Sequence, residues 1–337
     1  KKTKLVCVTV QSNQPSLGEG YESRNILSNG AARYFNIFYF FTIRKVLKQT
    51  GATHLLLEHP YYGWLGCLLK WSTGVKLMVH SHNMEGLRFK TMGKWWWKVL
   101  WWYERFTHRQ ANYNFFIHEP DRLYAIRHFK LDPARCLTVT YGIEWDQAPA
   151  QTELENAGRA LRVTHNIAAD EAILLFNGAF NYKPNLDALK RIIDVINPIL
   201  QKHALPYRII ICGRDIPEDI LNGHYPNMII TGFVNDISLY FKGADVFINP
   251  VVEGGGIKTK LVEALGYNLN AVSTENGAIG VDTAICNGKL LLTPDNNWTA
   301  FAEAIPLATR IKAGTPPEYF QHFYWGNTIE KLVKFIQ

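Results

Sequence analysis

The sequence lacks the features that mark secreted, metal-binding and membrane-spanning proteins. Its 337 residues include five scattered cysteines and no Cys-x-x-Cys pair, which favours reduced, buried thiols in a cytosolic protein. No apolar run reaches the roughly 18 residues that a membrane-spanning helix needs, and no signal peptide is visible. There is no Asp-x-Asp motif and no His/Cys cluster at metal-ligand spacing, so we expect no metal and no other cofactor. Hydrophobic residues make up 47% of the chain, which allows a large core.

The net charge of +7 is unevenly distributed. Residues 1–150 contain 20 Lys and Arg against 10 Asp and Glu, whereas the remainder contains 16 against 19. A basic half joined to a slightly acidic half predicts that the N-terminal half meets an anionic partner. A membrane surface, a phosphorylated acceptor and nucleic acid all fit this charge.

Predicted strands alternate with predicted helices in both halves of the chain, which indicates parallel, doubly wound sheets of the α/β class. The polar stretch 144–168 separates the halves and is the expected domain boundary. We therefore predict a first domain over 1–150, a second over 151–325, and a C-terminal helix over 326–337 that packs back on the first domain.

Four segments of the second half place glycines directly after a predicted strand. In a parallel sheet, ligands bind at this carboxyl edge of the strands. The segments are Asn177–Phe180, Gly213–Asp215, Gly232–Asp236 and Pro250–Glu263.

The last of these segments is the most informative. Gly254–Gly256 stand between a strand and a helix that begins near Lys258, an arrangement that turns backbone N–H groups and a helix N-terminus toward a bound anion. Lys258 and Lys260 lie in the first helical turn, where cations oppose the helix dipole but suit a phosphate. Glu263 follows three residues after Lys260 on the same side, and a carboxylate there can accept hydrogen bonds from a ribose diol.

These segments resemble the donor site of the family-4 glycosyltransferases, retaining enzymes of the GT-B fold. The resemblance spans about residues 173–292. It is fainter in the first half, where it involves KLMVHSHNME (Lys76–Glu85) and TVTYGIE (Thr138–Glu144). The matching stretches are FNGAFNYKPN (Phe176–Asn185), ICGRD (Ile211–Asp215), TGFVND (Thr231–Asp236) and GGGIKTKLVEALGYNLNAVSTENGAIG (Gly254–Gly280).

The resemblance implies a GT-B fold, with two Rossmann-like domains facing a cleft, and a role for individual residues. Glu263 would bind the nucleotide ribose and Lys260 the diphosphate; with His82 they are the expected catalytic residues. Gly178 would shape the loop under the phosphates, and Phe233 and Val234 would flank the base. The remaining expected donor-binding residues are Lys183, Gly213, Arg214, Gly254, Gly255, Gly256, Ile257 and Lys258.

Three departures from the family pattern affect these expectations. Members often carry two glutamates eight positions apart, but Gly255 stands eight before Glu263 and Glu253 is displaced by two. Many carry Arg and Lys after the glycine matching Gly178, and here Lys183 is the only nearby cation. The usual first strand and Gly-rich loop are not recognisable ahead of KLVCVTV, so we expect the first domain to be incomplete or reduced.

In the first half, His82 follows the strand Lys76–His80 at a position where family members often carry a histidine near the transferred sugar. An imidazole there can hydrogen-bond the sugar or shield developing charge. Asn83 and Glu85 are the expected acceptor-binding residues, with a helix-start carboxylate as the alternative for Glu85. We expect His82 and Glu85 to lie on the side of a cleft that faces Gly254–Gly256.

The stretch KWWWKVLWWYERFTHR (Lys94–Arg109) combines five tryptophans with basic residues. Helical spacing places Trp95, Trp102 and Phe106 on one stripe, and Trp97 and Trp101 on another. Tryptophan beside Lys and Arg suits a membrane interface, whereas the alternative is a helix whose indoles are shared between the core and an acceptor cleft.

We therefore expect a retaining hexosyltransferase that transfers a sugar from a nucleoside-diphosphate sugar to a saccharide or lipid-linked acceptor in cell-envelope or exopolysaccharide synthesis. It would be cytoplasmic, and peripheral at the inner face of the plasma membrane if its basic half binds anionic lipid. A nucleotide-sugar epimerase or a sugar phosphorylase of the same fold is the alternative. A more distant alternative is a non-enzymatic protein that binds a membrane or nucleic acid, but this function leaves Glu263 unexplained. We expect no nucleic acid as partner.

Overall fold

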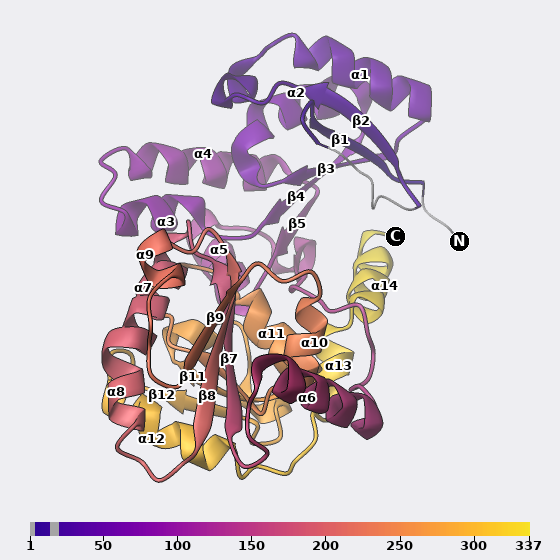
Figure 1. Ribbon diagram of the computed structural model, residues 1–337. Helices are drawn as coiled ribbons and strands as arrows, with labels where there is room; N and C mark the ends of the chain where they lie inside the picture. The colour runs from indigo at the N-terminus through magenta and orange to yellow at the C-terminus, as the bar shows by residue number, and fades with distance from the viewer. Residues whose placement is uncertain (1–3, 14–19) are drawn as a thin grey trace. The chain divides into compact units, whose positions relative to one another are not determined.

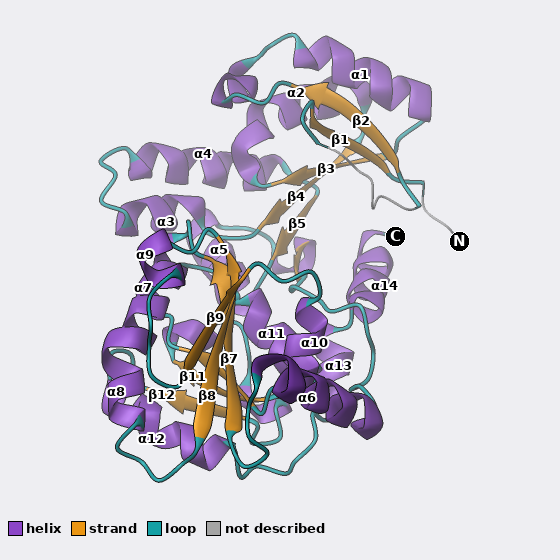
Figure 2. Cartoon of the chain, in the orientation of Figure 1, coloured by secondary structure: helices purple, strands orange, loops and turns teal. Residues whose placement is uncertain are grey.

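The computed structural model describes residues 4–13 and 20–337 and divides the chain into two compact α/β units. The first unit comprises the described residues up to Phe116 together with Pro120–Thr138, and the second comprises Ile117–Glu119 and Val139–Gln337. Each unit is built around a parallel sheet, which confirms the predicted fold class (Figure 2).

The first unit contains a four-stranded parallel sheet in the order β3-β4-β5-β6 and a separate parallel pair, β1-β2. The strands are β1 (Val6–Val10), β2 (Glu22–Leu27), β3 (His54–Glu58), β4 (Lys76–Ser81), β5 (Tyr113–Phe116) and β6 (Cys136–Thr138). The helices are α1 (Tyr39–Thr50), α2 (Gly63–Thr73), α3 (Glu85–Thr91), α4 (Trp97–Gln110) and α5 (Glu119–Phe129). In the register of β3 with β4, Glu58 lies beside His80 at the carboxyl edge of the sheet.

The second unit contains a six-stranded parallel sheet in the order β12-β11-β10-β7-β8-β9. Its strands are β7 (Ala172–Ala179), β8 (Tyr207–Arg214), β9 (Met228–Gly232), β10 (Val246–Asn249), β11 (Asn270–Thr274) and β12 (Leu290–Thr293). Read from β9 to β12, this is the doubly wound order 3-2-1-4-5-6, and its switch point lies between β7 and β10. The loops that leave these two strands are therefore the ones expected to hold a ligand.

Helices cover both faces of the six-stranded sheet (Figure 1). One face carries α7 (Lys183–Arg191), α8 (Asn197–Leu200) and α12 (Trp298–Ala308), and a π-helical turn over Ile192–Ile196 joins α7 to α8. The opposite face carries α6 (Gln151–His165), α10 (Ile237–Gly243), α11 (Thr259–Gly266) and α13 (Pro317–Phe323). The short α9 (Glu218–Leu221) and the final α14 (Trp325–Ile336) complete the unit.

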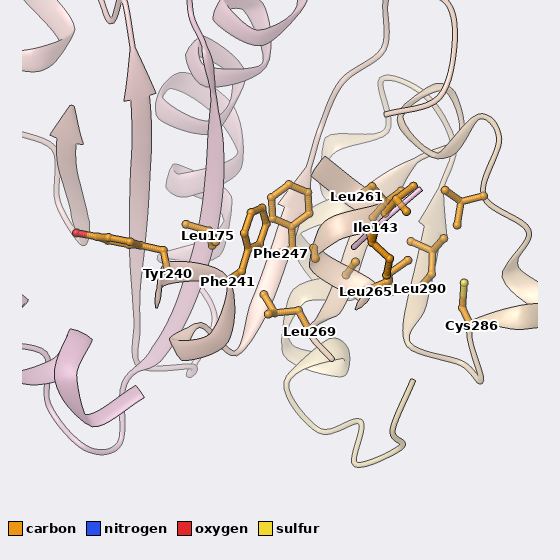
Figure 3. Close-up of a cluster of buried hydrophobic side chains, with 14 of the residues drawn as sticks. Ile143, Leu175, Tyr240, Phe241, Phe247, Leu261, Leu265, Leu269, Cys286 and Leu290 are labelled. Atoms are coloured by element: carbon orange, nitrogen blue, oxygen red, sulfur yellow. The ribbon is translucent and has the colours of Figure 1, made fainter. Parts of the chain in front are cut away.

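The core of the second unit consists of two clusters, one on each face of its sheet. Successive residues of a strand point to opposite faces, so Leu175 joins one cluster and Leu174 the other. Figure 3 shows the first cluster, in which Phe241 of α10 lies near Leu175 of β7, and Leu261 and Leu265 of α11 lie beside Ile143. These contacts fix the start of α11, which carries the expected phosphate site.

The predicted boundary of the first domain at residue 150 is displaced in the structure, where the units divide between Thr138 and Val139. The segment after Thr138 belongs to the second unit because Ile143 is buried in its core and the Trp145 indole N–H donates to the Gly266 carbonyl oxygen at 3.0 Å. Apolar residues in a predominantly polar stretch therefore decide the boundary. Most of the stretch 144–168 forms the helix α6, which buries Leu161. The C-terminal helix α14 is grouped with the second unit, and the packing of α14 on the first unit stays a prediction.

Candidate functional site

Two glycines allow a close backbone approach at the carboxyl edge of the second sheet. Gly178 of β7 is paired with Gly213 of β8. A Cβ atom at Gly213 would lie 1.8 Å from the Gly178 carbonyl oxygen, and the φ of Gly213 is 152°. Only glycine fits at position 213, which is a stronger constraint than the turn preference expected from the sequence.

The triple-glycine loop follows β10 across the switch point. Gly254 and Gly256 have φ values of 90° and 73°, which side chains strongly disfavour. A Cβ atom at Gly254 would lie 2.7 Å from the Tyr182 hydroxyl, so the loop after β7 and the loop after β10 meet here. Lys258 donates from Nζ to the carbonyl oxygens of Gly254 at 2.8 Å and Gly256 at 3.2 Å. Its ammonium group therefore braces the loop.

Lys260, in the first turn of α11, places its ammonium group at the β7 loop. A Cβ atom at Gly178 would lie 3.0 Å from Lys260 Nζ and 3.1 Å from Asn185 Nδ2. Burial lowers the pKa of Lys260 to about 8. Within residues 4–13 and 20–337, this Nζ atom has no hydrogen-bond acceptor and no carboxylate within ion-pair distance. Lys260 is partly buried, so its ammonium group is incompletely solvated, and an anion is the ligand that would complement its charge.

Glu263 lies one turn further along α11 and is also partly buried. Its Oε1 accepts a hydrogen bond from the Tyr141 hydroxyl at 2.6 Å. Burial raises the pKa of Glu263, while the Tyr141 bond and the Lys260 charge oppose the rise. Lys260 and Glu263 thus form a cation and a hydrogen-bond acceptor on one helix face, as the spacing predicts.

Phe233 and Val234 lie at the end of β9. The Phe233 ring is 72% exposed, whereas Val234 packs against the core. Both line a shallow, solvent-open hollow of about 530 Å³. The other lining residues are His165, Ile229, Ile230, Thr231, Asn235, Asp236, Leu239 and Tyr240.

The remaining expected donor residues occupy different environments. Arg214 is exposed beside Asp215, with 3.9 Å between Nε and Oδ2, and Gly255 is exposed at the loop tip. Ile257 is buried in the core. Lys183 forms ion pairs with Asp187 at 2.5 Å and Glu253 at 3.6 Å, so its charge is already balanced by carboxylates.

In the first unit, His82 lies at the carboxyl end of β4 and is hydrogen-bonded to a residue that the sequence did not single out. Its Nε2 lies 2.8 Å from Glu58 Oε2, and His80 Nδ1 lies 3.1 Å from the same oxygen. Hydrogen bonds to both imidazoles, opposed by burial, hold the pKa of Glu58 at about 2. The sequence shows no histidine cluster at metal-ligand spacing, whereas strand pairing brings Glu58 to the His80-x-His82 pair; the absence of a metal stays a prediction.

His59 adds a third imidazole next to His82. It follows β3 with φ 68° and ψ 154°, a conformation that is almost confined to glycine and costs roughly 1–3 kcal/mol. Its ring centroid lies 4.5 Å from that of His82. The strained backbone therefore serves to place this imidazole at the sheet edge.

Glu85 and Asn83, the expected acceptor residues, have contrasting surroundings. The Glu85 carboxylate is 1% exposed and accepts from the Tyr61 hydroxyl at 2.7 Å and from Arg88 Nε at 2.8 Å. Glu85 is the first residue of α3, and its backbone N–H donates to the Glu104 carboxylate. Asn83 Oδ1 is buried without a hydrogen-bond partner in the described parts of the chain and is free for an added donor. That His82 and Glu85 face Gly254–Gly256 stays a prediction.

Two family models match the chain, one in each half. Residues 6–147 match the model described as Glycosyltransferase Family 4, and residues 171–308 match the one described as Glycosyl transferases group 1. The chain belongs to the family-4 glycosyltransferases.

Similar solved structures show that this glycosyltransferase has the GT-B fold. The sucrose-phosphate synthase of Thermosynechococcus elongatus is 14% identical with a TM-score of 0.72, and the match covers 99% of this chain and 88% of that one. Anabaena HepE, solved in complex with UDP-glucose, is 12% identical with a TM-score of 0.67, covering 94% and 85%.

A match to a curated sequence covers a smaller part of the glycosyltransferase. A 44.6 kDa protein of the Klebsiella pneumoniae cps region is 27% identical over 119 residues, which is 33% of this chain. The match spans 31% of the length of that relative.

Outside the sites, the glycosyltransferase exposes an aromatic stripe along α4 and the turn before it. Trp95 and Trp102 are 85% and 58% exposed, and Val99 and Phe106 lie on the same side. The second predicted stripe turns inward, since the Trp101 indole donates to the Tyr124 hydroxyl at 3.0 Å. We call Trp95, Lys98, Val99, Trp102, Arg105, Phe106 and Arg109 the α4 face. No helix in the described chain is both long and apolar enough to cross a membrane.

Proposed function

We propose that this glycosyltransferase transfers a hexose or related sugar from a nucleoside-diphosphate sugar to an acceptor hydroxyl, with retention of the anomeric configuration. The observation that carries the proposal is the partly buried Lys260 ammonium, which has no partner among the described residues and lies close to Gly178 at the start of α11. A diphosphate bound there would supply the missing anionic partner.

The other donor contacts follow from this placement. The Glu263 carboxylate would accept hydrogen bonds from the ribose diol, and the base would enter the hollow beside Phe233. When the glycosidic bond breaks, negative charge develops on the leaving diphosphate, and Lys260 with the α11 N-terminus would stabilise it. Positive charge develops on the sugar, where the His82 imidazole would act as a hydrogen-bonding group.

Known proteins support a nucleotide-sugar donor and a polysaccharide product. HepE was solved with UDP-glucose, which makes uridine nucleotides the first donors to test. The Klebsiella pneumoniae relative lies in a cps region, which supports a saccharide or lipid-linked acceptor of the cell envelope.

A thermal-shift screen of nucleotide sugars tests the donor proposal. A ligand at about 100 times its dissociation constant adds about 2.7 kcal/mol of stability. We expect one nucleotide series to stabilise the wild type and to lose this effect in Lys260→Ala, while Lys312→Ala, an exposed control on the same unit, responds normally. If no nucleotide sugar stabilises the wild type, or Lys260→Ala responds equally, the donor site is wrong. Nuclear magnetic resonance of the product then distinguishes retention from inversion.

We further propose that the α4 face attaches the enzyme to anionic lipid at the inner face of the plasma membrane. The face combines exposed Trp95 and Trp102 with Lys98, Arg105 and Arg109 and contains no carboxylate. Indoles suit the headgroup region, and each nearby cation contributes about 1 kcal/mol.

Sedimentation with liposomes tests the attachment. Binding to anionic vesicles at low salt should weaken at high salt and in Trp95→Ala/Trp102→Ala, while Leu307→Ala, an exposed apolar control on α12, should bind as the wild type does. Equal sedimentation with neutral and anionic vesicles, or full binding by the double variant, would assign the tryptophans another role.

A further inference from the structure

The side chains of Glu58, His80 and His82 converge at the carboxyl edge of the first sheet. Glu58 ends β3, and the two histidines alternate along the end of β4, so both imidazoles lie on the same side as the carboxylate. One ligand atom from each residue lies within 4.8 Å of the others.

We infer that Glu58, His80 and His82 form a binding site for a divalent transition-metal ion of the Zn²⁺ type. In the structure, Glu58 Oε2 lies 3.1 Å from His80 Nδ1 and 2.8 Å from His82 Nε2. Tetrahedral zinc with bonds of about 2.0–2.2 Å holds its ligand atoms roughly 3.3 Å apart. An ion can therefore replace the two hydrogen bonds after small side-chain movements.

The chemistry and access of the cluster favour such an ion. Two imidazoles and one carboxylate are a ligand set for zinc, and they disfavour Mg²⁺ and Ca²⁺, which prefer oxygen ligands. His82 is 39% and Glu58 56% exposed, so the ion can enter and water can complete its coordination. The strained His59 backbone sets a further imidazole against His82, which limits the orientations open to the His82 ring.

A bound ion has a consequence for transfer that rests on the proposed function. With its Nε2 on a metal, His82 cannot hydrogen-bond a donor sugar through that atom. Zinc should therefore inhibit the enzyme, and a chelator should restore its activity.

Direct metal titration of the purified full chain, without a polyhistidine tag, tests the site. We expect one equivalent of Co²⁺ to give the intense visible absorption of a low-coordinate complex and Zn²⁺ to displace it. Glu58→Gln and His80→Asn should each weaken binding at least about tenfold, in line with losses seen when metal sites are altered. His224→Asn, an exposed histidine of the other unit, should bind normally. Circular dichroism establishes that each variant is folded.

The outcomes separate the site from the proposed reaction. Absence of stoichiometric Co²⁺ binding, or unchanged affinity in folded Glu58→Gln and His80→Asn, overturns the metal site whatever the enzyme transfers. If the wild type binds one equivalent of Co²⁺, the variants do not, and the bound ion leaves transfer uninhibited, the metal site is supported and His82 has no role in the transfer step. A failure of every nucleotide sugar to bind leaves the titration, and hence the site, unaffected.

Discussion

Replacing Lys260 by methionine should stabilise the protein while abolishing its donor binding. Methionine has a similar length but no charge, so it removes the partly buried ammonium and largely fills the same space. The pKa of Lys260 is lowered from 10.5 to about 8 by burial. At about 1.4 kcal/mol for each pH unit, keeping this group charged costs up to about 3 kcal/mol near pH 7.

The sign of this effect gives it a characteristic pH dependence. Between pH 8 and 10.5 the unfolded chain holds the Lys260 proton more tightly than the folded chain does, so the wild type gains stability as the pH rises. The advantage of Lys260→Met should thus be complete below pH 8 and should shrink above it. Lys258 and Lys289, whose pKa values are also lowered to about 8, are present in both proteins and cancel in the difference.

Thermal unfolding of both proteins at pH 7 and pH 9.5 measures the difference. A gain of up to about 3 kcal/mol corresponds to an increase of several degrees in Tm for a unit of this size. Lys258→Met is the matched control, because its ammonium bonds Gly254 and Gly256 and its removal should give a smaller gain or a loss. A Lys260→Met protein that is no more stable than the wild type at pH 7, or that still binds the donor, would refute the reasoning.

Three other substitutions probe the donor half. Glu263→Ala should lower donor turnover at least about tenfold, or about 1.4 kcal/mol, in steady-state kinetics; unchanged turnover would exclude the ribose contact. Tyr141→Phe removes a hydrogen bond that lowers the pKa of Glu263, so the acidic limb of donor affinity against pH, measured by titration calorimetry, should move to higher pH; an unmoved limb contradicts this. Gly213→Ala should lower the free energy of unfolding by more than about 2 kcal/mol in denaturant unfolding, because its Cβ atom would lie 1.8 Å from the Gly178 carbonyl oxygen. As a control, Gly158→Ala in α6 should be neutral or stabilising, because its added Cβ atom would lie 3.6 Å from the nearest atom. Equal effects of the two substitutions would contradict the packing argument.

The sequence predicted the second unit better than the first for a physical reason. Each strand of the second unit is a continuous apolar run that ends in glycine or polar residues, so strand, turn and helix follow one another within a short local window. The helix Thr259–Gly266, with Lys260 and Glu263 on one side, begins within one residue of the start predicted near Lys258. In the first unit, β2 (ESRNIL) was missed because its alternation of polar and apolar residues is weak.

Contacts between residues distant in the chain were beyond local reasoning. Glu58 and His82 are 24 residues apart, and Tyr141 and Glu263 are 122 apart. Local patterns selected one partner in each pair, and only strand register or packing identified the other. Lys183 is a further example. Its position suggests a phosphate ligand, which stays a prediction, and local reasoning did not identify its ion pair with Glu253, an acid on another loop.

The segment that follows the first unit in sequence has a consequence for dissecting the enzyme into autonomous halves. Ile143 accepts from Trp325 N–H at 3.0 Å and donates to the Phe323 carbonyl at 2.7 Å, so the two chain ends of the second unit are bonded to each other. A donor-binding fragment cut at residue 150 would lose this closure together with Tyr141, the partner of Glu263. A fragment that begins near Val139 retains both and lacks only Ile117–Glu119 of the second unit. We expect it to refold independently and to be exchangeable between related enzymes as a donor-binding module.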